Sequence, residues 1–129
     1  MPRRLQATFP NWKNVSQYND GAEVAPGVRA IRHARHARGI CRFLVASGGQ
    51  QLFIQSDVTG LHHLFVRNPG WYSMFDMDGP KAEATRRALF LDRVIAEKAT
   101  IAGYHFGFPN VGFTISKDGS SYAFEPVKA

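Results

Sequence analysis

Two apolar strands joined by a glycine turn constrain this chain more than any other stretch. Residues 40–46 (Ile-Cys-Arg-Phe-Leu-Val-Ala) and 51–56 (Gln-Leu-Phe-Ile-Gln-Ser) flank Ser47-Gly48-Gly49, a pattern that predicts a β-hairpin. The returning strand ends just before one carboxylate, Asp57. Two imidazoles bracket it in sequence, His36 before the hairpin and His105 after a later strand. A carboxylate and imidazoles at strand ends predict one metal-binding cleft.

The remaining pattern predicts an α/β or α+β layer architecture with one long helix. Asp78-Gly79-Pro80 is a helix start, and apolar residues keep helical spacing from there to about residue 98. Residues 1–20 are expected to be an irregular lead-in, and residues 58–71 a long loop. Further short strands are expected at 22–24, 28–31, 100–104, 111–116 and 122–124.

Length and composition favour one soluble domain in a reducing compartment. The 129 residues are 44% hydrophobic and 20% charged, which is typical of a globular chain with a modest core. The sequence has no apolar run of the roughly 20 residues that span a membrane, and no apolar stretch follows its N-terminus. The single Cys41 excludes an intrachain disulfide and predicts the cytoplasm.

The net charge of +6 allows contact with anions, including nucleic acid. The charge is concentrated in five arginines between Arg29 and Arg42. This stretch is either a solvated basic face or the surface of a small nucleic-acid-binding module. It has no interleaved aromatic residues and matches no nucleic-acid motif, so nucleic acid is the less favoured partner.

Each candidate ligand also has a purely structural interpretation. Asp57 could cap the turn that follows its strand, and His105 could be a hydrogen-bonded structural histidine. His36 stands in an unusual Arg-His-Ala-Arg-His-Ala-Arg run. Taken together, imidazole and carboxylate groups are ligands that suit zinc and similar divalent ions.

Several segments together resemble the second half of a metallo-β-lactamase-fold hydrolase. The resemblance covers roughly residues 15–127 in consistent order, and is strongest to the branch with lactonase-like and organophosphate-hydrolase-like members. The segments that carry it are Ala25-Pro26-Gly27-Val28-Arg29, Phe43-Leu44-Val45-Ala46-Ser47-Gly48-Gly49, Gln55-Ser56-Asp57-Val58-Thr59, Arg67-Asn68-Pro69-Gly70-Trp71, Met74-Phe75-Asp76-Met77-Asp78, Ala84-Thr85-Arg86-Arg87 and Gly103-Tyr104-His105-Phe106.

This resemblance implies half of an αββα sandwich and a site for two divalent metal ions, most often zinc. It implies Asp57 as the ligand that bridges both metals, His105 as the last ligand, and His36 as a ligand from the preceding motif. It also implies metal-hydroxide attack on an ester, lactone or phosphotriester. His62, His63, Trp71 and Phe106 are expected to line the substrate pocket; the alternatives are exposed loop histidines and core aromatics.

Two departures from the family pattern set limits on activity. The family's His-x-His-x-Asp-His motif occurs nowhere in these 129 residues, so residues 21–129 are expected to be a C-terminal half whose N-terminal half is absent. Such a truncated chain is expected to be inactive alone, because too few ligands remain for each metal. Around His36 the family's Pro-Gly-His turns are also missing, and we hypothesise a one-nucleotide reading-frame slip there, which sequencing of the gene would test.

A half-sandwich would leave one face of its sheet uncovered. Phe43, Val45, Leu52 and Ile54, or their alternates along the same strands, would lie on that face. The chain is therefore expected to pair with a separate first-half polypeptide, to form a homo-oligomer through the open face, or to be an unstable, non-catalytic interaction remnant.

Overall fold

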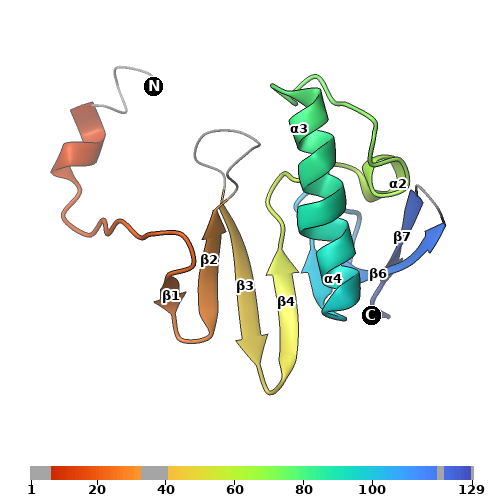
Figure 1. Cartoon of the computed structure of the whole chain (residues 1–129). Helices are drawn as coiled ribbons and strands as arrows, with labels where there is room; N and C mark the ends of the chain where they lie inside the picture. Colours follow the sequence, from red (N-terminus) through yellow and green to blue (C-terminus); the bar gives the residue numbers. More distant parts are fainter. Residues whose placement is uncertain (1–6, 33–40, 119–120, 129) are drawn as a thin grey trace.

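The computed structural model describes residues 7–32, 41–118 and 121–128, and its sheet carries a helical layer on one face (Figure 1). The chain order is η1 (Phe9–Asn11), β1 (Glu23–Ala25), β2 (Val28–Arg32), β3 (Cys41–Ser47), β4 (Gln50–Ile54), α2 (His62–Phe65), α3 (Gly79–Ala84), η2 (Thr85–Leu91), α4 (Asp92–Ala96), β5 (Thr100–Ala102), β6 (Val111–Asp118) and β7 (Ser121–Pro126). This α+β architecture confirms the predicted fold class.

The seven strands form one mixed sheet in the order of the sequence, β1 to β7. Neighbouring strands are antiparallel except β4 and β5, which pair in parallel with Ile54 opposite Ala102. A parallel pair needs a long crossover connection, and the helices between residues 62 and 96 provide it. The two strands therefore end at the same edge of the sheet.

The crossover helix begins where the sequence predicts. The side chain of Asp78 accepts a hydrogen bond from the backbone N–H of Lys81, and Pro80 occupies the first turn, where its missing N–H costs nothing. Helical structure continues through α3, the π-helical segment η2 and α4 to Ala96. Lys98 then adopts a left-handed backbone with φ of 50°, which ends the helix two residues before the predicted boundary.

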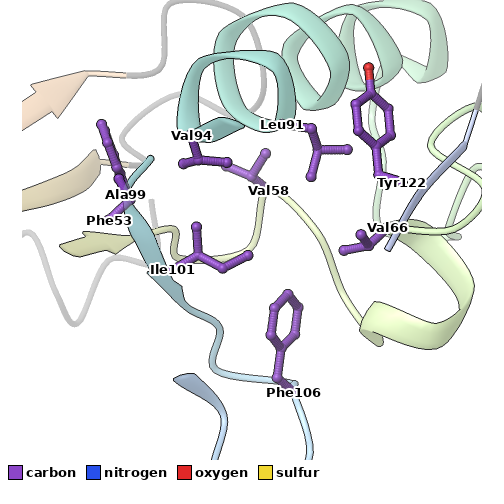
Figure 2. Close-up of a cluster of buried hydrophobic side chains, with 9 residues drawn as sticks. All are labelled: Phe53, Val58, Val66, Leu91, Val94, Ala99, Ile101, Phe106 and Tyr122. Atoms are coloured by element: carbon purple, nitrogen blue, oxygen red, sulfur yellow. The ribbon is translucent and has the colours of Figure 1, made fainter. Parts of the chain in front are cut away.

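The core lies between this helix and one face of the sheet (Figure 2). Leu91 and Val94 on the helix pack in one buried cluster with Phe53 of β4 and Ile101 of β5. The hydroxyl of Tyr122 donates to a carboxylate oxygen of Asp92 at 2.7 Å, which ties β7 to the helix. This packing fixes the crossover against the two parallel strands.

The opposite face of the sheet carries apolar side chains outside this core cluster. Phe43 pairs with Ile54, and Val45 pairs with Leu52, so all four point to the same side. Each of the four is partly exposed. Their alternates Leu44 and Phe53 point to the helix side, where Phe53 is fully buried.

The structure differs from the sequence prediction mainly in the connections. The expected loop at 58–71 contains the short helix α2, because residues 62–65 close one helical turn. The expected strand at 100–104 ends at Ala102, since Gly103 to Phe106 form a turn in which Phe106 N–H donates to Gly103 C=O. No helix in the described part of the chain is long and apolar enough to cross a membrane.

Candidate metal site

Asp57 and His105 meet because they follow paired strand ends. Asp57 comes three residues after Ile54 and His105 three residues after Ala102, and these two strand ends are parallel neighbours. Nε2 of His105 lies 3.2 Å from Oδ1 of Asp57. The side chains remain 60% and 56% exposed, so both can contact a ligand.

A buried amide shapes the turn that presents Asp57. Gln55 is fully buried; its Oε1 accepts from the backbone N–H and the hydroxyl of Thr59, at 2.9 and 2.6 Å, and its Nε2 donates to Thr59 C=O at 3.0 Å. One side chain thus closes both ends of the turn, and Asp57 stands at its tip. Ser56 holds a positive φ of 56° and donates its hydroxyl to Cys41 C=O at 2.6 Å, which anchors the turn to β3.

The turn that presents His105 packs directly against the Gln55 side chain. A Cβ on Gly103 would lie 2.6 Å from the ring of Phe106 and 2.7 Å from Nε2 of Gln55. No side chain fits there, so Gly103 allows the two turns to approach. Phe106 itself is buried in the core cluster and so anchors the turn that carries His105. The positions of Asp57 and His105 therefore depend on the same few contacts.

A cavity of about 530 Å³ opens beside the Asp57–His105 pair, and we call it the Asp57 cavity. Its apolar walls are Val58, Leu61, Phe65 and Phe75. Asp57 and His105 supply the exposed polar groups, and the buried Arg86 and Asp76 line another part of the wall. An apolar cavity with a few polar groups is the usual form of a small-molecule site.

Arg86 holds the wall of the Asp57 cavity in place. Its guanidinium donates to the backbone carbonyls of Val58 at 3.1 Å and Trp71 at 2.9 Å, and also to that of Pro69. It lies 3.5 Å from the carboxylate of Asp76 and stacks over the ring of Phe65. Burial lowers the pKa of Arg86, and the neighbouring Asp76 opposes that shift. Sequence reasoning missed this residue, although an arginine on the buried side of a helix is a signal.

The structure places His62 and His63 on a second cavity, of about 450 Å³, between α2 and β7. The His62 ring lies against Phe106 and Phe124, with centroids 5.3 and 4.8 Å apart. Burial, with a smaller contribution from His63, lowers the pKa of His62. Neither histidine lines the Asp57 cavity. Trp71 is half-exposed and contributes its backbone carbonyl to Arg86.

His36 lies outside the described residues. The residues that bound its segment, Arg32 and Cys41, pair with each other across β2 and β3. They lie at the same edge of the sheet as Asp57 and His105, since Ser56 next to Asp57 bonds to Cys41. The backbone therefore leaves and re-enters the described structure beside the candidate site.

The Asp57–His105 pair fits part of a metal coordination shell. The two atoms of the 3.2 Å contact, an imidazole nitrogen and a carboxylate oxygen, are both ligand atoms that zinc binds, and both side chains are open to the cavity. A catalytic zinc usually takes three protein ligands. Within residues 7–32, 41–118 and 121–128, no three His, Cys, Asp or Glu side chains gather at one point. The pair alone is thus too small a ligand set for a catalytic zinc.

Solved structures of other proteins show which known fold this chain resembles. The hydrolase AbOPH of the β-lactamase superfamily matches 84% of this chain with a TM-score of 0.75 and 28% identity. This chain has part of the fold of a β-lactamase-superfamily hydrolase. AidC, a dizinc quorum-quenching lactonase solved with the product N-hexanoyl-L-homoserine, shares this fold. Its TM-score is 0.79, with 22% identity, and the match covers 99% of this chain. A probable metal-dependent hydrolase from Staphylococcus aureus also shares the fold, with a TM-score of 0.66 and 17% identity over 87% of this chain.

The chain spans less than half of each of these hydrolases. It covers 37% of AbOPH, 46% of AidC and 39% of the Staphylococcus aureus protein. No protein-family model and no curated protein matches the sequence. The recognition made from the sequence is confirmed at the level of a partial metallo-β-lactamase fold.

Proposed function

We propose that this chain is the part of a metal-dependent hydrolase that carries the Asp57–His105 ligand pair. The observation behind the proposal is the 3.2 Å contact between these side chains, at the mouth of a cavity, in a fold shared with metal-dependent hydrolases. Asp57 and His105 would each donate one atom to a divalent cation, most simply zinc, and His36 is a further proposed ligand. A zinc bound there supplies Lewis acidity for attack on a carbonyl or phosphoryl centre.

The Asp57 cavity suits a small substrate with an apolar group. The walls from Val58, Leu61 and Phe75 would bind that group and exclude water from it. The exposed Asp57 and His105 at one side would then face the ester, lactone or phosphotriester to be cleaved. Such a substrate is a proposal from chemistry and from the lactonase and hydrolase neighbours.

Completion by another polypeptide segment is part of this proposal. The 129 residues contain no His-x-His-x-Asp-His motif, and only two candidate ligands meet in the described part of the chain. We expect no hydrolysis by the chain alone. A completing segment would also cover the sheet face that carries Phe43, Val45, Leu52 and Ile54; in its absence that face favours homo-oligomers.

The nucleic-acid alternative finds no support. Arg42 is only 3% exposed, and burial lowers its pKa to about 10, so it is no part of a surface that contacts phosphates. The arginines at positions 35 and 38 lie outside the described residues. The proposed compartment remains the cytoplasm, on the basis of the single Cys41.

Zinc binding by the complete 129-residue chain tests the proposal. Isothermal titration with zinc should show a site that Asp57→Asn and His105→Asn each weaken at least about tenfold, since even loss of an outer-shell partner costs that much. His63→Asn is the matched control, because His63 is exposed but lines the other cavity. Unchanged affinity in both site variants would remove the pair from any ligand role.

A further inference from the structure

The cavity between α2 and β7 is lined by basic, hydroxyl and apolar side chains, and by no acidic side chain of the described residues. Figure 1 shows α2 beside β7 at the end of the sheet. We call this space, of about 450 Å³, the α2–β7 cavity. The residues that line it are His62, His63, Arg67, Ser121, Tyr122, Ala123 and Phe124.

One helical turn brings the two exposed basic groups to this cavity. The backbone N–H of Arg67 donates to His62 C=O at 3.4 Å, so the turn that begins in α2 continues to Arg67. His63 and Arg67 are four residues apart, and side chains with this spacing lie on the same side of a helix. Both residues are exposed. Among the described side chains, no carboxylate forms an ion pair with either of them.

These donors select an anion. The guanidinium of Arg67 is always charged, and its planar fork of N–H groups matches the oxygens of a carboxylate or a phosphate. The imidazole of His63 can donate a further N–H. A metal cation would meet the positive charge of Arg67 and no carboxylate among the lining residues. The donor set therefore fits an oxyanion that accepts charge-assisted hydrogen bonds.

Another wall of the α2–β7 cavity is aromatic. The ring of His62 lies 4.8 Å from that of Phe124 and 5.3 Å from that of Phe106, centroid to centroid. Phe124 packs against the core cluster, so this wall is held in place. Burial lowers the pKa of His62, which therefore contributes a neutral ring at pH 7. Rings beside charged donors suit a ligand that has a planar apolar part as well as an anionic part.

The α2–β7 cavity is separate from the candidate metal site and from the open sheet face. It shares no lining residue with the Asp57 cavity. Tyr122, which lines it, bonds to Asp92 of α4, so the cavity lies on the side of the sheet that carries the helices. Phe43 and Ile54 point to the other side. A ligand in the α2–β7 cavity therefore contacts neither the Asp57–His105 pair nor the open face.

We propose that the α2–β7 cavity binds an organic oxyanion, a phosphate monoester or a carboxylate attached to a planar apolar ring. Arg67 and His63 hold the oxyanion, and the ring lies against Phe124. The volume of about 450 Å³ is within the range of small-molecule sites. This second site goes beyond the proposed hydrolytic function and does not depend on it.

Titration calorimetry of the complete chain with phenyl phosphate and with benzoate tests the proposal. The buffer contains EDTA, which keeps divalent metal away from Asp57 and His105. At least one anion should bind saturably with a Kd below about 10 mM, and the tighter of the two identifies phosphate or carboxylate as the preferred group. Benzyl alcohol, which has the ring without the charge, should bind at least about tenfold more weakly. No saturation by either anion up to about 10 mM, or equal binding of benzyl alcohol, would overturn the proposal.

Matched variants separate this site from general attraction to a basic protein. Arg67→Gln should weaken binding of the anion at least about tenfold and His63→Gln at least about threefold, because each removes a charge-assisted hydrogen bond. Arg87→Gln is the control: it removes the same charge from a guanidinium that pairs with Glu83 and does not line the cavity. Its affinity should be unchanged. Equal weakening by Arg67→Gln and Arg87→Gln would overturn the proposal, since the net charge of +6 would then account for binding.

Nuclear magnetic resonance locates the bound anion. In spectra of the ¹⁵N-labelled chain with EDTA, phenyl phosphate should shift the amide signals of His63, Arg67 and Ala123 and leave those of Asp57 and His105 in place. Shifts at Asp57 and His105 without shifts at Arg67 would put the anion in the other cavity and overturn the proposal. Zinc titration of Arg67→Gln should match that of the parent, so failure of the anion site is distinguishable from failure of the metal site.

Discussion

Arg86 offers the sharpest test of how the cavity wall is built. Replacing it with methionine keeps the aliphatic stem and removes the guanidinium. Asp76, whose side chain is 6% exposed, then becomes a buried carboxylate without its cationic partner, and the carbonyls of Val58, Pro69 and Trp71 lose a charged donor. Breaking a buried ion pair from one side costs about 3–5 kcal/mol. A chain of this length has a total stability of roughly 6–19 kcal/mol, so the loss is a large share.

The measurement is the free energy of unfolding from urea titrations followed by circular dichroism. Arg86→Met should lose about 3–5 kcal/mol. Arg86→Lys should lose about 2 kcal/mol, because it keeps the charge and gives up the planar fork that reaches several acceptors. The double variant Arg86→Met with Asp76→Leu should be more stable than Arg86→Met alone, because no unpaired charge stays buried.

The neighbouring Arg87 is the matched control. It pairs with Glu83 at 2.8 Å one helical turn away, and both side chains are about one-third exposed. Such a pair contributes about 0.3–0.5 kcal/mol, so Arg87→Met should be nearly neutral. The reasoning would be refuted if Arg86→Met lost less than about 1 kcal/mol, or if the Arg87 variant lost as much as the Arg86 variant.

Three further outcomes follow from the turns and rings around the site. Gln55→Met should cost about 2–4 kcal/mol in urea unfolding and weaken zinc binding, because it leaves the buried polar groups of Thr59 unpaired. A change below about 0.5 kcal/mol would contradict the role of the Gln55–Thr59 hydrogen bonds. Gly103→Ala should cost about 1–3 kcal/mol by the same assay, since its Cβ would meet a ring at 2.6 Å, and a neutral result would contradict the close approach. Because burial lowers the pKa of His62, the unfolded chain binds more protons as pH falls below about 6.5, and stability should fall there; His62→Phe should abolish this loss while His63→Gln largely keeps it.

The sequence predicted the regular elements well because their signals are local. The Ser47-Gly48-Gly49 turn requires positive φ, which Gly48 and Gly49 adopt at 56° and 79°. The Asp78 cap and the early proline gave the correct start of the long helix. Each of these features depends on neighbours in sequence, so it can be inferred without the rest of the fold.

The features that complete the candidate site are not local, and the sequence did not reveal them. The parallel pairing of β4 with β5 depends on how the crossover helix packs, and no turn residue encodes it. Reasoning from strand ends did anticipate that Asp57 and His105 would converge. It grouped His62 and His63 with them, whereas α2 turns these histidines toward β7. The burial of Asp76 was also missed, because the buried Arg86 that pairs with it lies on another element.

The parallel pairing of β4 and β5 also sets when the proposed metal ligands Asp57 and His105 can come together. Asp57 and His105 are far apart in the chain and meet only after the crossover helix has folded back and β5 has docked beside β4. Closing such a long loop is entropically costly, and contacts of high sequence separation form slowly. A chain still emerging from the ribosome would present Asp57 long before His105 exists. Metal uptake would thus report that the long-range topology is complete, and bound metal would then stabilise that topology over the unfolded chain.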